Sequence, residues 1–139
     1  QDDVEFLPGT RQWLEENWPG NDGVVNLYRS TKYAVQDDRA TWSYLRHNEP
    51  YLGMLATVIS KGCLYSLIDN LGAMEDGSNK KDDIKFGQFC SALRIPVNIA
   101  VASRCQHIGV KSSLYPTTGL SNLRQASTYV KQRHSVLPS

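Results

Sequence analysis

Cysteine and histidine are the residues of this chain best suited to metal binding or nucleophilic chemistry, and Cys105 and His107 form their closest pair. A structural zinc site needs four ligands, which usually come in paired spacings such as CxxC and HxxxH. Cys90 lies too far before Cys105 to make such a pair, and no second pair completes a set of four. We therefore expect no metal site and no cofactor.

A thiol nucleophile would need a histidine base and a residue that orients the base. Cys63, His107 and Asn122 occur in the order cysteine, histidine, asparagine, but most chains of this length contain such a series. Cys63 also falls on an apolar helical stripe, where a cysteine packs as a small hydrophobic residue. We expect three buried free thiols, which favour a reducing intracellular compartment, although one disulfide and one free thiol would also fit. We expect no enzymatic activity, with a hidden Cys/His site as the least supported alternative.

Neighbouring carboxylates do not converge on one site when they lie on a helix, because successive side chains point in different directions. Such neighbours are typical of helix caps, first helical turns and solvated loops. They occur at Asp2-Asp3, Glu15-Glu16, Asp37-Asp38, Glu75-Asp76 and Asp82-Asp83. The phosphate-binding loops GxGxxG and GxxxxGK[ST] are absent, so no common catalytic signature remains.

The distribution of charge is the clearest functional signal. The chain has 15 Lys or Arg and 14 Asp or Glu, and its formal net charge is only +1. All of the acids nevertheless lie in residues 1–83, whereas residues 84–139 contain basic residues and no acid. Opposite charge in the two halves of a chain indicates a polyanionic partner.

Nucleic acid is the partner that this pattern favours. Binding to nucleic acid is driven largely by Lys and Arg neutralising phosphates, and nearby carboxylates would repel the strand. The acid-free half predicts a contact surface whose candidate phosphate-binding residues are Arg104, Lys111, Arg124, Lys131 and Arg133. No named nucleic-acid motif matches, so single-stranded RNA and DNA both remain open.

The acidic half suggests a second role. If one end of the molecule is acidic and the other basic, head-to-tail contacts between copies are favoured, and such contacts build rings or filaments. The residues expected to contact a neighbouring copy are Trp13, Glu15, Glu16 and Trp18. A protein that self-associates and holds a strand would resemble a capsid or nucleocapsid subunit in a virion or ribonucleoprotein particle. The missing initiator Met would fit release from a precursor.

Helices are the elements expected to position these residues. Apolar residues recur at helical spacing along most of the chain, most strongly at Leu52, Leu55, Ile59, Cys63, Leu67 and Leu71. The predicted fold is an all-α, compact single-domain bundle of about six helices over residues 1–139, with residues 1–9 as an extended N-terminal arm. The candidate helical segments cover about 10–18, 24–35, 40–48, 50–71, 83–93, 96–108 and 121–134. Two of the expected helices are uncertain, and the β-branched residues of 24–35 leave a strand possible there.

Residues 75–83 are expected to form a solvated loop between the acidic and basic halves of this domain. No apolar run is long enough to span a membrane. The sequence therefore predicts a non-enzymatic nucleic-acid-binding structural protein that self-associates. The alternative is a helical protein–protein interaction or scaffold domain that binds no nucleic acid.

Overall fold

The computed structural model describes residues 4–35, 37–47, 49–70, 72, 77 and 80–107. Over these residues the protein is a mixed α/β structure with three helices and six strands, so the predicted all-α bundle is wrong. In chain order the elements are β1 (Val4–Phe6), α1 (Thr10–Glu16), β2 (Val24–Asn26), β3 (Trp42–Tyr44), β4 (Thr57–Ile59), α2 (Lys61–Asp69), α3 (Asp82–Ala92), β5 (Val97–Ala100) and β6 (Cys105–His107). No helix of the described part is long and apolar enough to cross a membrane.

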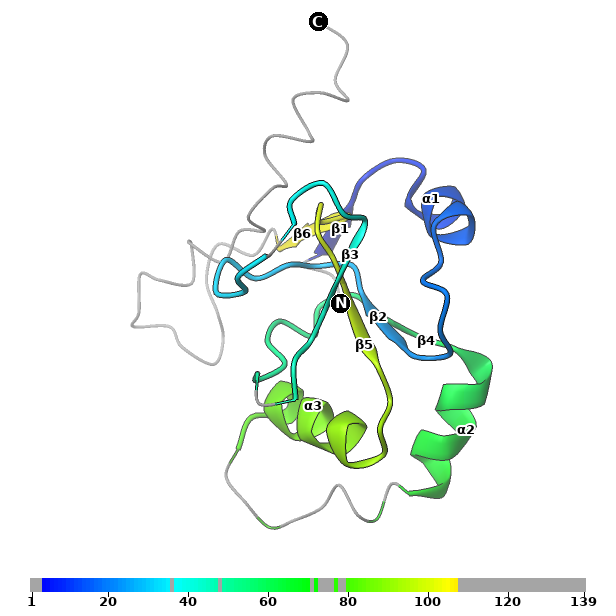
Figure 1. Ribbon diagram of the computed structural model, residues 1–139, viewed down its shortest axis with the longest axis vertical. Helices are drawn as coiled ribbons and strands as arrows, with labels where there is room; N and C mark the ends of the chain where they lie inside the picture. Colours follow the sequence, from blue (N-terminus) through cyan, green and yellow to red (C-terminus); the bar gives the residue numbers. More distant parts are fainter. Residues whose placement is uncertain are drawn as a thin grey trace, which may run out of the picture.

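The strands form two sheets (Figure 1). Four short strands lie in the order β3-β5-β2-β4, with β2 and β5 parallel and the outer strands antiparallel to their neighbours. In this sheet Val24 lies opposite both Ile59 and Val97. The second sheet pairs β1 with β6, so that Val4 lies opposite His107. Both sheets therefore join strands from the two ends of the described chain.

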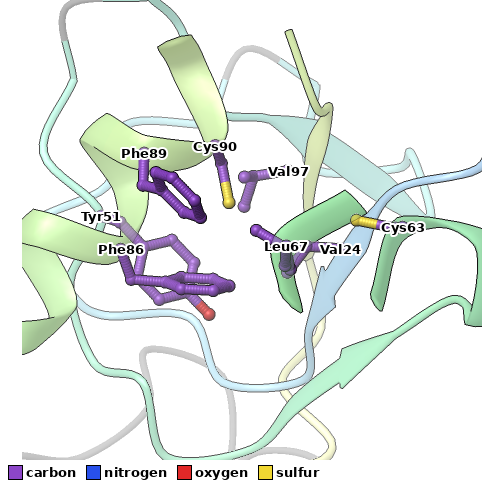
Figure 2. Close-up of a cluster of buried hydrophobic side chains, with 8 residues drawn as sticks. All are labelled: Val24, Tyr51, Cys63, Leu67, Phe86, Phe89, Cys90 and Val97. Atoms are coloured by element: carbon purple, nitrogen blue, oxygen red, sulfur yellow. The ribbon is translucent and has the colours of Figure 1, made fainter. Parts of the chain in front are cut away.

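The four-stranded sheet has an apolar core on each face. Successive residues of a strand point to opposite faces, and Val24 and Val25 accordingly belong to different clusters. Val25 packs with the residues around α1, whereas Val24 packs with α2 and α3. Figure 2 shows the second cluster, in which Phe86, Phe89 and Cys90 of α3 point toward Leu67 of α2.

The strand VNIA explains one error of the helical prediction. All four residues of β5 are buried, because the strand lies inside the sheet and both of its faces are covered. A continuous apolar run of this kind has no period of two, so it cannot be distinguished from a buried helix by spacing alone. Residues 96–108 were expected to form one helix, whereas the described part of this range contains β5 and β6.

The apolar stripe over residues 50–71 was also misread. Among the described residues of this range only Lys61–Asp69 is helical, whereas Thr57–Ile59 is strand β4. Ser60 caps the helix, since its side chain accepts a hydrogen bond from the Cys63 backbone N–H at 3.3 Å. A stripe of every fourth residue thus runs by coincidence through a loop, a strand and a helix. The two predictions that are confirmed as helices are α1 and α3, close to the expected positions.

The three cysteines are free and buried, as predicted. Burial raises the pKa of Cys90 and of Cys105 to about 12, and burial also raises the pKa of Cys63. The folded protein therefore keeps these thiol protons in a range of pH where the unfolded chain, with a thiol pKa near 9.0, has lost them.

Stability is therefore expected to decline as the pH rises above about 9 toward 12. In that interval the unfolded state binds fewer protons than the folded state, so the free energy of unfolding decreases with pH. Urea unfolding at a series of alkaline pH values checks this. A Cys90→Ala, Cys105→Ala double variant should show a weaker pH dependence than the wild type, and an equal dependence would contradict the assignment.

Candidate functional site

A pocket of about 700 Å³ lies between α3 and residues 45–47 and 49–51. One wall comes from the chain that follows β3, and the other comes from residues of α3 spaced three or four apart, which share one helical face. Besides Tyr51, the polar and charged residues that line it are Arg46, His47, Glu49, Gln88, Ser91 and Arg94. This volume lies within the range of about 300–1,000 Å³ that is usual for ligand pockets.

The close approach of α3 to Tyr51 shapes this pocket. Both Gly87 and Tyr51 line it, and a Cβ atom on Gly87 would lie only 2.4 Å from the Tyr51 Cβ. Tyr51 is fully buried, and its hydroxyl shares a hydrogen bond with Thr57 Oγ1 at 2.7 Å. Its ring packs edge-on against Phe86, with 5.7 Å between the ring centroids. Glycine at position 87 is thus required for the two walls to meet.

The polar groups of the pocket come from both walls. His47 Nδ1 and Ser91 Oγ share a hydrogen bond of 2.9 Å. Glu49 Oε2 accepts a hydrogen bond from the Arg46 backbone N–H at 3.0 Å, and Glu49 Oε1 lies 4.0 Å from Arg46 Nε. This carboxylate is therefore directed at its own loop. A catalytic triad also needs an acid that orients the histidine. Among the described residues no acid contacts His47, so the pair of His47 and Ser91 does not form such a triad.

Arg94 has an unusual backbone conformation at the end of α3. Its φ is 57°, the only positive value among the non-glycine residues that the structure describes. The backbone N–H of Ile95 donates to Cys90 O at 2.8 Å and that of Arg94 donates to Ser91 O at 3.1 Å, which is the hydrogen-bond pattern of a helix C-cap where glycine is favoured. An arginine therefore occupies a position that costs about 1 kcal/mol for any residue with a Cβ.

The predicted nucleic-acid-binding residue Arg104 lies away from this pocket, between β5 and β6. It is half-buried, and its guanidinium stacks on the Trp13 ring at 4.9 Å from the ring centroid. Arg104 Nη2 donates to Pro8 O at 3.5 Å, while Nε is buried without a hydrogen-bond partner in the described structure. Burial lowers the pKa of Arg104. This residue thus joins the C-terminal strands to α1.

The four residues predicted to contact a neighbouring copy have different environments. Trp13 is half-buried against Trp42, with ring centroids 5.4 Å apart. Glu15 accepts a hydrogen bond from Arg11, and Glu16 accepts one from Gln12, all on the exposed side of α1. Trp18 is 37% exposed, and its indole N–H donates to Asn21 O. Trp13 is therefore a core residue in contact with Arg104, whereas Glu15, Glu16 and Trp18 reach the surface.

The remaining predicted phosphate contacts, Lys111, Arg124, Lys131 and Arg133, lie outside the described residues. Within the described part, β5 lies between β3 and β2, and β6 pairs with β1. The two described strands of the basic half therefore pair only with strands of the acidic half. The charge division along the chain does not separate two ends of the described fold.

Sequence reasoning missed the pocket, whose walls lie more than thirty residues apart in the chain. Arg94 belongs to the acid-free half, but its C-cap position was not recognised. Arg46 and His47 were assigned to a helix, whereas they follow β3 in an irregular segment. No cluster of three or more His, Cys, Asp or Glu that could hold a metal occurs in the described part of the chain.

Comparison of the chain with protein-family models, with curated proteins and with solved structures gives no match.

Proposed function

We propose that this chain is a non-enzymatic nucleic-acid-binding structural protein that self-associates, and that the pocket beside α3 holds part of a phosphate backbone. The observation that carries the proposal is the grouping of Arg46, His47 and Arg94 around one pocket of about 700 Å³. The guanidinium groups of Arg46 and Arg94 can neutralise phosphates, and the side chains of His47, Gln88 and Ser91 can donate hydrogen bonds to phosphate or sugar oxygens.

The charge of the pocket favours an anion. Glu49 is the one carboxylate among the lining residues, and it is engaged by the Arg46 backbone N–H and lies near the Arg46 guanidinium. Arg94 has no ion-pair partner in the described part of the chain. The positive charge of Arg94 is therefore free to bind an anionic ligand. In this proposal the basic residues beyond position 107 bind further phosphates of the same nucleic acid.

The strained backbone at Arg94 supports a functional role for its side chain. A non-glycine residue held in the left-handed region lowers stability, and such residues cluster at functional sites, where the side chain is kept despite this cost. Glycine would satisfy the same C-cap without strain. The pocket therefore contains an arginine at a position where the fold alone favours glycine.

The variant Arg94→Gly is expected to change stability and binding in opposite directions. The free energy of unfolding should rise by about 1 kcal/mol, because glycine adopts a positive φ without a steric penalty. Affinity for single-stranded RNA or DNA should fall by about three- to ten-fold at low salt, and the salt dependence should weaken by about the contribution of one phosphate contact. Urea unfolding and fluorescence anisotropy with labelled oligonucleotides at two salt concentrations measure the two effects.

The matched control is Arg39→Gln, which removes an exposed cation that does not line the pocket. It should leave the affinity nearly unchanged. A separate Arg124→Glu, Lys131→Glu variant tests the C-terminal contribution. No binding of either nucleic acid at low salt would overturn the proposal and would favour the alternative of a protein-interaction or scaffold domain.

That alternative has one specific observation in its favour. Three of the seven large hydrophobic residues exposed in the described part lie on α2, namely Leu64, Tyr65 and Ile68. A concentration of exposed apolar side chains is typical of a protein contact surface. Helix α2 is therefore also a candidate surface for the self-association that is part of the main proposal.

A further inference from the structure

Helix α2 has apolar residues both on the face that packs against the core and on the face that is exposed. Cys63 and Leu67 are buried against the core. Leu64, Tyr65 and Ile68 are 42%, 58% and 51% exposed, and their spacing places them on one outer face. Figure 1 shows α2 at the periphery of the fold, beside β4.

The charges at the ends of α2 oppose its helix dipole. The helix begins with Lys61 and ends with Asp69, and it has no acid in its first turn and no basic residue in its last turn. The N-terminus of a helix favours negative charge and its C-terminus favours positive charge. Asp22 offsets part of the mismatch at the N-terminus, where its Oδ2 would lie 2.6 Å from a Cβ atom on Gly62. No described residue offsets Asp69 at the other end by an ion pair.

We propose that two copies of this chain associate through α2, with the two helices antiparallel and crossing at Tyr65. Lys61 and Asp69 lie equally far on either side of Tyr65, so each Lys61 meets the Asp69 of the other copy. The apolar residues Leu64 and Ile68 then pack between these charge pairs. This inference rests on the self-association in the proposed function and assigns it to one surface.

The second copy is the occupant that the charges favour. An antiparallel partner brings an acid to the N-terminus of α2 and a base to its C-terminus, so it supplies at each end the charge that the helix dipole favours. The same patch is used by both copies, as a two-fold interface requires. A nucleic acid would meet the exposed Asp69 carboxylate on this face, which repels its phosphates.

The contact is small, since each helix has nine residues. Interfaces of this size are typical of weak or transient association. We therefore expect the association at high protein concentration, or between copies bound to the same nucleic-acid strand.

Charge reversal at the two ends of α2 tests this geometry on the full chain. In Lys61→Asp alone or in Asp69→Lys alone, both ion pairs of the dimer become repulsive, and the dimer dissociation constant should rise roughly ten- to thirty-fold. In the double variant Lys61→Asp, Asp69→Lys, both pairs return and the dissociation constant should recover. An equimolar mixture of the two single variants should form a heterodimer in preference to either homodimer. Analytical ultracentrifugation over a range of concentrations measures each case.

Two controls separate this contact from folding and from nucleic-acid binding. Asp69→Lys should raise the melting temperature of the monomer by about 1–3 °C, because a cation replaces an anion at the helix C-terminus. The charge variants should retain oligonucleotide affinity when measured below the dimerisation range. Failure of Arg94→Gly to alter binding would count against the pocket and leave this contact standing.

A wild-type chain that stays monomeric at every concentration overturns the inference. A dimer whose dissociation constant is unchanged in both single charge variants also overturns it, because the contact would then lie elsewhere.

Discussion

Replacing Gly87 by alanine is expected to lower the free energy of unfolding by about 2–3 kcal/mol. The added Cβ would lie 2.4 Å from the Tyr51 Cβ and 3.2 Å from the Tyr51 backbone nitrogen. Tyr51 is fully buried and is held by Thr57 and Phe86, so it has no room to retreat. The steric cost therefore exceeds the gain of about 1 kcal/mol that alanine usually gives over glycine in a helix.

Gly62→Ala provides a matched control in α2. There the nearest atom to an added Cβ is Asp22 Oδ2, at 2.6 Å. Asp22 is exposed, and its carboxylate can rotate away at little cost. Gly62→Ala should therefore leave the free energy of unfolding unchanged or raise it by up to about 1 kcal/mol. Urea unfolding with comparison of the m-values measures both variants. Equal effects of the two substitutions would show that the contact between α3 and Tyr51 does not limit the fold.

Replacing Asn98 by leucine is expected to cost about 2–4 kcal/mol of stability. Asn98 is fully buried in β5. Its Nδ2 donates to Asn21 Oδ1 and to Val24 O, both at 3.0 Å, and its Oδ1 accepts from Asn21 Nδ2 at 2.9 Å. Leucine leaves the Asn21 amide and the Val24 carbonyl without these partners in a dry site.

The isosteric variant Asn98→Asp tests the same network through pH. At neutral pH the introduced carboxylate would face the Val24 carbonyl and the Asn21 oxygen, which disfavours the charged form. The folded-state pKa of this carboxyl group should therefore lie above the unfolded value of about 3.9. The folded state then takes up a proton first as the pH falls, so the free energy of unfolding should rise relative to the wild type between the two pKa values.

Urea unfolding of wild type, Asn98→Asp and Asn98→Leu across that pH range measures this recovery. Asn98→Leu should run parallel to the wild type, because it adds no titrating group. An Asn98→Asp profile that also runs parallel to the wild type would mean that water reaches the site.

The sequence predicted α1 and α3 because their signals are local. Each has apolar residues on one face and clear turn residues before it, and neither depends on a distant partner. The strands depend on distant partners. Val24 and Val25 have the β-branched side chains of a strand, but only the pairing with Val97 and Ile59 decides the outcome.

The pocket was even harder to predict from the sequence than the strands. His47 and Ser91 become neighbours only when the segment after β3 meets α3. Arg104 was predicted to bind phosphate at the surface, because it belongs to the half of the chain that contains no acid. Its contact with Trp13 required the pairing of β1 with β6, which no spacing in either segment indicates.

The position of β5 sets an order of assembly that differs from the order of synthesis. Strand β3 pairs only with β5, and β1 pairs only with β6, among the strands that the structure describes. On a ribosome these two early strands must therefore wait, with their hydrogen-bonding groups unmatched, until residues 97–107 have been made. Such long-range pairing slows folding and leaves strand edges open to other chains during synthesis. A nascent chain that stalls within residues 80–96 already carries α2 and its outer apolar face but lacks three of the four described strand pairings, so it exposes both unpaired strands and apolar surface to other chains.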